Sequence, residues 1–233
     1  MSVSFGAIKA LSNVTLSIND DSDICGIIGP NGAGKSTLLS VIAGEVSPSG
    51  GTVELFGDSN KKKLNPETVN RKGISRTFQI PRPFFGLTVE RNIVTCGLGV
   101  NNLNDSQEKA KRLLKILELD KHAHSTAGQL NLAGRKRLEL AKALMTEPKV
   151  LLLDELFEGL NEQEVDSLVN IVKNEIASSS IKVVLVEHVI SALRKLANKV
   201  YVLNQGELIA EGETEEVLSD EVVIEAYLGK QKV

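Results

Sequence analysis

Apolar and polar residues along this chain form strand-like and helix-like segments in alternation. Short apolar runs predict buried strands at Ile24–Ile28, Val150–Leu153 and Val183–Val186. A helical pattern over Lys35–Ala43 stops at Gly44, which is typical of a helix end. Buried strands that alternate with helices predict an α/β fold with a parallel sheet.

The two ends of the chain add antiparallel elements to this pattern. Residues 199–203 and 207–209 flank a Gln-Gly pair and predict a β-hairpin. The segment 47–57 predicts a turn followed by an alternating strand, and Glu221–Leu228 predicts a short helix.

The middle of the chain is mostly helical in pattern. Pro81 and Pro83 break the chain after Gln79, and helical spacing then continues to about residue 148. The apolar spacing i, i+3, i+4, i+7 predicts an amphipathic helix through Ala110, Leu113, Leu114 and Leu117. We predict one domain over residues 1–233, with a core formed by 1–79 and 149–233 and an inserted helical subdomain at 80–148.

Composition restricts the partners and the location. The 233 residues carry a net charge of −3, which does not favour nucleic acid as a partner. Apolar runs are only a few residues long, whereas a membrane-spanning helix needs about 20. The first residues lack the features of a secretory signal, and Cys25 and Cys96 have no metal or redox spacing, so both are expected to be small buried residues. We expect a soluble, cytoplasmic protein with a solvated lysine loop at 61–63.

A glycine-rich stretch indicates a phosphate-binding loop. GPNGAGKST contains the pattern G-x-x-x-x-G-K-[ST], in which Gly29, Gly32 and Gly34 let the backbone turn its N–H groups toward phosphate oxygens. Lys35 is expected to reach the β- and γ-phosphates, and the Ser36 hydroxyl to ligate Mg²⁺. The alternative is a glycine turn that only caps a helix. The predicted strand before the stretch and the helix after it favour the phosphate loop.

Two predicted strands end in polar residues suited to phosphate chemistry. VLLLDE ends in Asp154, which suits a metal ion, and Glu155, which suits the activation of an attacking water. A strand end with a polar turn is the alternative. VVLVEH ends in His188, which is expected near the phosphates because strand ends of a parallel sheet line the ligand crevice. For His188 the alternative is a structural hydrogen-bonding role.

The stretch LNLAGRKRLELAKAL, residues 130–144, is open to three interpretations. It looks like the start of a helix that meets a phosphate, yet its only glycine is Gly134. It is a working nucleotide contact, a decayed one, or an ordinary basic helix. Its own residues do not decide among these three.

The order of the motifs resembles that of the ATP-binding subunits of ABC transporters, nearly from end to end. GPNGAGKST resembles the Walker A loop, LLLDE the Walker B strand with its catalytic glutamate, and RTFQIPRPF the Q-loop around Gln79. LNLAGRKRLELAKAL stands where the family has its L-S-G-G-Q signature, EGLN where it has the D-loop, and His188 where it has the switch histidine. Phe5 resembles the aromatic residue that stacks on adenine, and we expect it on a mobile end because few residues precede it.

The resemblance implies a fold and a set of site residues. The fold is a P-loop NTPase core, with a RecA-like parallel sheet and an antiparallel β subdomain, plus an inserted α-helical subdomain. The implied catalytic residues are Glu155, His188 and Gln79, and the implied Mg²⁺ ligands are Ser36, Gln79 and Asp154. The residues implied to contact ATP are Phe5, Gly29, Asn31, Gly32, Ala33, Gly34, Lys35, Ser36, Thr37, Asn131, Ala133, Gly134 and Asn161.

The signature and the D-loop depart from the family pattern. Asn131 replaces the serine of L-S-G-G-Q, Leu132 and Ala133 replace its two glycines, and Gly134 replaces its glutamine. Asn131 can cap the helix, and its amide can donate to a phosphate. Ala133 adds a methyl group that can push the phosphate away, but we expect the segment to stay functional because its backbone N–H groups remain. Asn161 stands in the D-loop where many members have aspartate, which keeps the hydrogen-bonding geometry and removes the charge.

Three cations follow the signature at Arg135, Lys136 and Arg137. Cations in the first turn of a helix oppose its dipole, and a nearby phosphate would reverse that penalty. The alternative is a basic outer face that pairs with local acids such as Glu139.

Longer phrases resemble the branched-chain amino acid importers within the family: RTFQIPRPFFGLTVERNI, EGLNEQE, LVEHVI and VIEAYLGK. This implies an ATP-hydrolysing subunit that pairs with a second ATP-binding subunit, as a homo- or heterodimer. ATP-driven closure of the dimer would power transmembrane permease subunits, which would hold the chain on the inner face of the cell membrane. The alternatives are an ATP-binding regulatory or weakly active partner in an asymmetric pair, and a non-transport ATPase acting on DNA or the ribosome.

Overall fold

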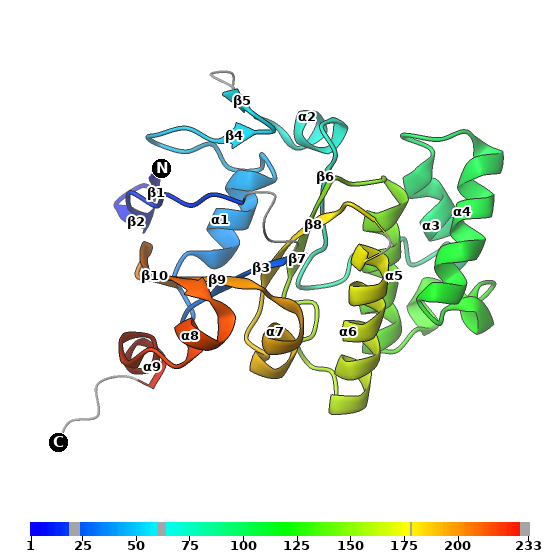
Figure 1. Cartoon of the computed structure of the whole chain (residues 1–233). Helices are drawn as coiled ribbons and strands as arrows, with labels where there is room; N and C mark the ends of the chain where they lie inside the picture. Colours follow the sequence, from blue (N-terminus) through cyan, green and yellow to red (C-terminus); the bar gives the residue numbers. More distant parts are fainter. Residues whose placement is uncertain (19–23, 60–63, 178, 229–233) are drawn as a thin grey trace. The chain divides into compact units, whose positions relative to one another are not determined.

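The helices and strands of the computed structural model fall into two units (Figure 1). The first unit combines Met1–Lys72 with Val183–Val233, and the second is Gly73–Lys182. The structure describes residues 1–18, 24–59, 64–177 and 179–228, so the predicted lysine loop at 61–63 lies outside the described residues.

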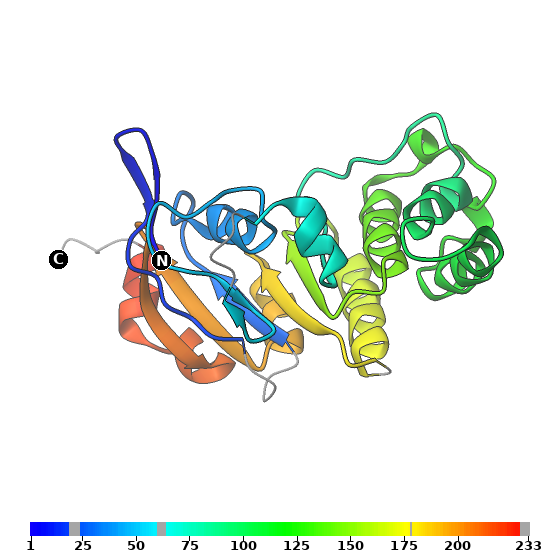
Figure 2. The ribbon, with the colours of Figure 1, turned by 90° about the horizontal axis from the view of Figure 1, so that it is seen from above.

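The first unit contains a sheet between helices. Its elements are β1 (Val3–Phe5), β2 (Ile8–Leu11), β3 (Ile24–Ile28), α1 (Lys35–Ile42), β4 (Glu54–Leu55), β5 (Asp58–Ser59), α2 (Pro66–Arg71), β8 (Lys182–Val186), α7 (Ile190–Leu196), β9 (Lys199–Asn204), β10 (Glu207–Glu213), α8 (Thr214–Leu218) and α9 (Glu221–Leu228). In the order β10-β9-β3-β8, β3 runs parallel to β8 and β9, and β10 runs antiparallel to β9. Helices α1 and α7 lie on opposite faces of this sheet (Figures 1 and 2). A Cβ at Gly26 would lie 2.6 Å from Leu193, so this glycine permits the close packing of α7.

The second unit is mainly helical. Its elements are β6 (Ile74–Arg76), α3 (Val89–Gly97), α4 (Leu103–Ile116), the 3₁₀ turns η1 (Asp120–His122) and η2 (Ala127–Gln129), α5 (Leu132–Met145), β7 (Val150–Asp154) and α6 (Glu162–Ala177). Strands β6 and β7 are parallel, and α3, α4 and α5 pack together. The predicted amphipathic helix is α4, which buries Ala110, Leu113 and Leu114. The predicted helical subdomain at 80–148 lies within this unit, and its boundaries stay a prediction.

Most predicted elements are present, and two predictions need correction. The strand predicted in 47–57 is only Glu54–Leu55, because Phe56 and Gly57 adopt φ values of 56° and 75° and turn the chain directly into β5. Cys25 is buried as expected, but Cys96 is half-buried.

The N-terminal residues include a hairpin, and the expected mobility of this end stays a prediction. Phe5 pairs with Ile8 in the β1–β2 hairpin. The Met1 ammonium donates to the Val14 carbonyl at 2.5 Å. Phe5 is 51% exposed, so its ring is accessible from a structured hairpin.

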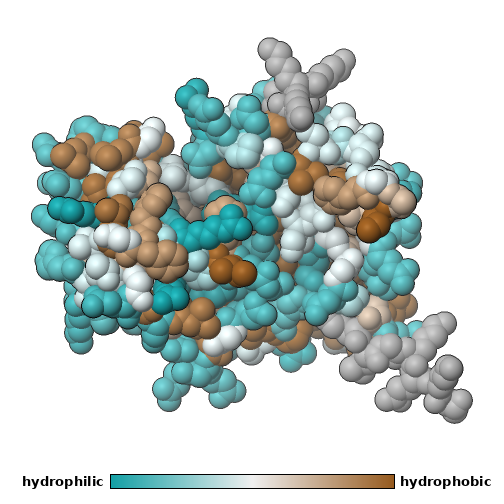
Figure 3. Space-filling model, turned by 180° about the vertical axis from the view of Figure 1, so that it is seen from behind, coloured by the Kyte–Doolittle hydropathy of each residue, from teal (hydrophilic) through white to brown (hydrophobic). Residues whose placement is uncertain are grey.

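The surface carries polar and apolar residues in mixture on the face drawn in Figure 3. Exposed large apolar side chains include Phe84 and Phe85, in the segment before α3. In the described part of the chain, none of the helices has both the length and the apolar character that crossing a bilayer requires.

Candidate functional site

The glycine-rich loop connects β3 to α1 and is shaped by its glycines. Gly29, Gly32 and Gly34 adopt φ values of 150°, 80° and 102°, a range that L side chains rarely enter. A Cβ at Gly29 would lie 2.0 Å from the Leu203 carbonyl oxygen, and one at Gly34 would lie 2.6 Å from the Ala10 carbonyl oxygen. Packing therefore excludes a side chain at both of these positions.

The turn of the β9–β10 hairpin supports this loop. The Gly206 N–H donates to the Ala33 carbonyl at 3.0 Å, and the Ser12 N–H donates to the Gly206 carbonyl at 2.7 Å. Sequence reasoning predicted the hairpin but not this contact. No local pattern signals it, because more than 170 residues separate Ala33 from Gly206.

The loop presents donors suited to an anion. Lys35 is 5% exposed, and its ammonium donates to the carbonyl groups of Gly29 (2.8 Å) and Pro30 (3.1 Å). Ser36 is exposed in the first turn of α1, where unpaired N–H groups and the helix dipole favour negative charge. This arrangement suits a phosphate group.

His188 follows the end of β8, the strand that runs parallel to β3, and the glycine-rich loop follows the end of β3. Val186, at the end of β8, pairs in parallel with Ile27, two residues before Gly29. His188 follows β8 and is half-buried. The parallel register therefore supports the predicted nearness of His188 to the phosphate loop.

A cavity of about 630 Å³ lies beside the phosphate loop. The loop residues Pro30–Ala33 form one wall, and Val222 and Glu225 of α9 contribute to another. The C-terminal helix therefore lies next to the loop tip, a contact that the sequence pattern did not indicate.

In the second unit, Asp154 combines a bonded oxygen with one that lacks a partner. Asp154 is 4% exposed at the end of β7, and its Oδ2 lies 2.7 Å from the Arg76 guanidinium. Its Oδ1 is buried and has no hydrogen-bond partner among the described residues. A buried carboxylate oxygen without a donor suits a hard divalent cation, so this residue fits the predicted Mg²⁺ site.

The Glu155 side chain is hydrogen-bonded to that of Gln79, which lies 76 residues earlier in the chain. Glu155 is 7% exposed and adopts a φ of 49°, which is uncommon for a residue with a side chain. Its Oε2 accepts a hydrogen bond from Gln79 Nε2 at 2.5 Å, and the same nitrogen lies 3.2 Å from Glu158 Oε2. The structure therefore brings together two predicted catalytic residues, and it adds Glu158, the first residue of the D-loop segment EGLN, for which no catalytic role was predicted.

The structure corrects the partner named for the three signature cations, whereas a phosphate near them stays a prediction. Arg135 donates to the Gly128 carbonyl at 3.0 Å. Arg137 pairs with Glu118, and this hydrogen bond holds the pKa of the Glu118 carboxyl below its ordinary value. The acid Glu139 pairs with Lys142 at 2.6 Å rather than with the three cations.

Lys136 is buried and is therefore not part of an outer basic face. It is 2% exposed, and its ammonium donates to the backbone carbonyl groups of Glu155 (2.6 Å) and Gln79 (2.9 Å). The helical spacing turns this position inward, toward the segments that carry the predicted catalytic residues.

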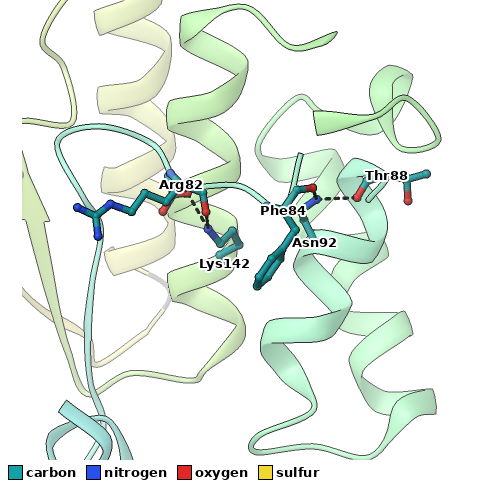
Figure 4. Close-up of polar contacts among 6 residues, drawn as sticks. Arg82, Phe84, Thr88, Asn92 and Lys142 are labelled. Carbon is teal, nitrogen blue, oxygen red and sulfur yellow. Dashed lines mark hydrogen bonds and ion pairs between the residues drawn. The ribbon is translucent and has the colours of Figure 1, made fainter. Parts of the chain in front are cut away.

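The segment after Gln79 is braced by two further side chains (Figure 4). Lys142 donates to the Arg82 carbonyl at 2.9 Å. Asn92 is fully buried, and its amide accepts from Phe84 N at 2.7 Å and donates to Phe84 O at 3.1 Å and Thr88 O at 3.0 Å. These contacts fix the course of the chain between Gln79 and α3.

The signature segment begins α5 with a side-chain cap. Asn131 Oδ1 accepts from Gly134 N at 2.8 Å, so the predicted cap is confirmed. Ala133 is 8% exposed and Leu132 is 44% exposed. The methyl group of Ala133 therefore lies in the interior, and Leu132 is the apolar residue that the segment presents at its surface.

Asn161 begins the next helix in a similar way. Asn161 Oδ1 accepts from Glu164 N, and Glu164 Oε2 accepts from Asn161 N, both at 3.0 Å. This reciprocal pair stabilises the first turn of α6. Asn161 is nevertheless exposed, which leaves its side chain accessible.

Residues 11–158, more than half of the chain, match the family model described as ABC transporter. The chain belongs to the ABC transporter family. A second model, described as branched-chain amino acid ATP-binding cassette transporter, matches residues 207–233 of this ABC cassette. The predicted identity as an ATPase subunit of an ABC transporter is thereby confirmed.

Two relatives of this ABC cassette align over nearly its whole length. It is 31% identical to the high-affinity branched-chain amino acid transport ATP-binding protein BraF of Pseudomonas aeruginosa, with 99% of this chain and 96% of that protein covered. It is 32% identical to the protein of the same description, LivG, of Escherichia coli (strain K12), with 97% and 94% covered.

Solved structures confirm the α/β P-loop fold. A nucleotide-free ATP-binding cassette of an ABC transporter superposes with a TM-score of 0.87 at 31% identity, covering 98% of this chain and 96% of that one. A cassette in its ADP conformation gives a TM-score of 0.86 at 33% identity, with the same coverage. A dimeric cassette in a post-hydrolysis state, bound to ADP and Pi, gives 0.81 at 25% identity, covering 91% and 95%.

Proposed function

We propose that this chain is the ATP-hydrolysing subunit of an importer for branched-chain or other amino acids. The observation that carries the ATPase mechanism is Glu155, a carboxylate buried directly after Asp154 and held by the Gln79 amide. The cargo class rests on the match of residues 207–233 and on the descriptions of BraF and LivG.

ATP would bind through the loop of the first unit. The N–H groups of the segment from Gly29 to Gly34 and the Lys35 ammonium would hold the phosphates, with Asn31, Ala33, Ser36 and Thr37 completing the contacts. Lys35 would exchange its bonds with the carbonyl groups of Gly29 and Pro30 for bonds with phosphate oxygens. The exposed ring of Phe5 would stack on adenine.

Asp154, whose Oδ1 has no partner among the described residues, would be a ligand of Mg²⁺, and the family resemblance implies Ser36 and Gln79 as further ligands. The ion would neutralise charge on the β- and γ-phosphates. The Arg76 guanidinium keeps Asp154 oriented by binding its other oxygen.

Glu155 would orient and deprotonate the water that attacks the γ-phosphate, and Gln79 would position its carboxylate. His188 would contact the γ-phosphate from the end of β8.

A second ATP-binding subunit would complete each site. We propose that the signature residues Asn131, Ala133 and Gly134, with Asn161, contact the ATP held by the partner, and that Ala133 does so through its backbone. Closure of this homo- or heterodimer would be transmitted to transmembrane permease subunits, which would hold the chain on the cytoplasmic face of the membrane. The single-domain organisation, with a helical subdomain at 80–148, is part of this proposal.

The test combines the wild-type chain with Glu155→Gln. We expect the wild-type chain to hydrolyse ATP, and the variant to bind ATP, to lose at least about 100-fold in kcat and to accumulate as an ATP-bound dimer on size-exclusion chromatography. Normal turnover of the variant would remove Glu155 from the role of base. A wild-type chain that turns over only after a sister subunit is added would instead favour a weakly active partner in an asymmetric pair, to which the exposed Leu132 in the signature points.

Cargo is tested separately. The chain is reconstituted with its permease subunits and binding protein in liposomes, and ATP-dependent uptake of radiolabelled leucine is compared with that of arginine. Uptake of arginine without leucine would overturn the branched-chain assignment and leave the ATPase assignment intact.

A further inference from the structure

Lys136 donates to the backbone of both predicted catalytic residues in the second unit. Its ammonium lies 2.6 Å from the Glu155 carbonyl oxygen and 2.9 Å from the Gln79 carbonyl oxygen. The side chains of Glu155 and Gln79 are themselves bonded at 2.5 Å. Lys136, Glu155 and Gln79 therefore form a closed ring of hydrogen bonds.

This ring of hydrogen bonds includes the backbone carbonyl group of Glu155, a residue in an unfavourable conformation. Glu155 adopts a φ of 49°, a left-handed conformation that is unfavourable for a residue with a Cβ. Its carbonyl group lies in the turn after β7, where it also accepts a long 3.4 Å bond from Glu158 N. A charge-assisted bond from a buried ammonium is stronger than this neutral contact, and it fixes the direction of the Glu155 peptide.

The lysine itself comes from the start of α5. Asn131 caps this helix, and Lys136 lies five residues later, within its first two turns. Any shift of the capped end along the helix axis moves Lys136 with it, because an α-helix is stiff over this distance. The signature segment and the Glu155 backbone are therefore joined through one side chain.

We infer that Lys136 is a positioning residue, which holds the Glu155 carboxylate and the Gln79 amide in their working arrangement and ties both to the signature end of α5. This inference rests on the proposed role of Glu155 in ATP hydrolysis. Because a displacement of about 1 Å at a reacting group can lower a rate by about 100-fold, loss of this tether acts on kcat.

Lys142 provides a matched control on the same helix. It also donates to a backbone carbonyl of the segment after Gln79, that of Arg82, and its side chain is 13% exposed. It pairs in addition with the buried Glu139, so its loss is expected to cost at least as much stability as the loss of Lys136. No bond between Lys142 and Glu155 is present in the described part of the chain.

The experiment compares Lys136→Met, Lys136→Arg and Lys142→Met in the full chain, with ATP affinity, KM, kcat and thermal unfolding measured for each. We expect Lys136→Met to lower kcat by at least about tenfold with ATP affinity within about twofold of wild type, and Lys142→Met to keep kcat within about twofold. Lys136→Arg retains charge and donors and should keep at least about a third of kcat.

Three results would overturn the inference: a wild-type kcat in Lys136→Met, an equal loss of kcat in Lys142→Met, or an Arg variant as slow as the Met variant. If Lys136→Met does not fold, Lys136→Gln replaces it. We expect Lys136→Gln to lower kcat by at least about threefold at constant KM. A wild-type kcat in Lys136→Gln would overturn the inference in the same way. A wild-type chain without ATPase activity, both alone and with a sister subunit, would instead contradict the proposed function. An active wild-type chain with an inactive Glu155→Gln and an unaffected Lys136→Met would contradict only the role of Lys136.

Discussion

The phosphate loop and the signature segment are both candidate phosphate contacts, yet they are constructed differently. The phosphate loop consists of backbone in left-handed conformations, with Gly29 and Gly34 packed directly against carbonyl groups from other strands. The signature segment begins an ordinary helix, with the side chain of Asn131 as its cap. The phosphate loop has no room for a side chain at Gly29 or Gly34, whereas the start of α5 depends on the hydrogen bond from Gly134 N to Asn131 Oδ1.

This difference gives a physical reason why this chain keeps the family pattern in the phosphate loop and departs from it in the signature segment. A motif formed by left-handed glycines in close packing loses its shape when a Cβ is added. A helix start keeps its free N–H groups with any residue except proline, provided that a capping oxygen is present. The substitutions at Asn131 and Ala133 are therefore compatible with an intact helix start, as the structure shows.

The largest expected effect is at Gly29. Gly29→Ala places a methyl group 2.0 Å from the Leu203 carbonyl oxygen, which forces the backbone to move. We expect the Kd for ATP to rise by at least about 100-fold, measured with a fluorescent ATP analogue.

Gly32 is the matched control for Gly29. It has a φ of 80°, but an added Cβ would meet nothing within 4 Å. Gly32→Ala should therefore cost only the backbone strain, about 1–2 kcal/mol, or roughly a 5- to 30-fold weaker Kd. Equal losses in the two variants would show that conformation, rather than packing, determines the loop.

The next effect concerns the cap of α5. Asn131→Ala removes the acceptor for Gly134 N and should lower the free energy of unfolding by about 1 kcal/mol, measured by urea denaturation. Asn131→Ser keeps a capping oxygen and should match the wild type within a few tenths of a kcal/mol. A wild-type stability for the alanine variant would indicate that the cap does not hold the signature segment.

A smaller effect is expected at Ala133. Because its methyl group is buried, Ala133→Gly should not open the surface to a phosphate. We expect kcat and KM to stay within about twofold of wild type, while unfolding is easier by about 0.5–1 kcal/mol because glycine is more flexible in the unfolded chain. A several-fold gain in kcat/KM would show that the methyl group obstructs the nucleotide contact.

The smallest effect tests whether the signature cations are paired locally. Arg137 lowers the pKa of Glu118 below its ordinary value of 4.5, so this pair stabilises the fold above about pH 4.5 and loses its contribution as the pH falls through the lowered pKa. Glu118→Gln should destabilise the chain at pH 7 by a few tenths of a kcal/mol, because Glu118 is largely exposed.

The measurement is the difference in urea midpoint between wild type and Glu118→Gln across pH 3 to 7. The difference should shrink on acidification and vanish once Glu118 is protonated in the folded state. A difference that is constant with pH would mean that Arg137 stabilises the helix through its bonds to Leu117 and Ser167 instead.

Much of the fold and the candidate site was predictable from local pattern. The buried strand β3, the helix α9 and the hairpin β9–β10 follow from apolar spacing and turn residues, which act within a few positions of the chain. The cap at Asn131 was predictable for the same reason. The short strand Glu54–Leu55 was not, because the left-handed conformation of Phe56 has no signal in a residue of that type.

The sequence by itself determined the family, the phosphate loop and the order of the acidic and glutamine motifs, because each is a contiguous run with a fixed chemical requirement. Only the tertiary structure decided what the side chains between those runs do. It turned Lys136 inward onto the carbonyl groups of Glu155 and Gln79, left Asp154 Oδ1 without a donor among the described residues, and placed Gly206 against the phosphate loop. These contacts join positions that are 19 to more than 170 residues apart, and distant packing rather than local periodicity selects them.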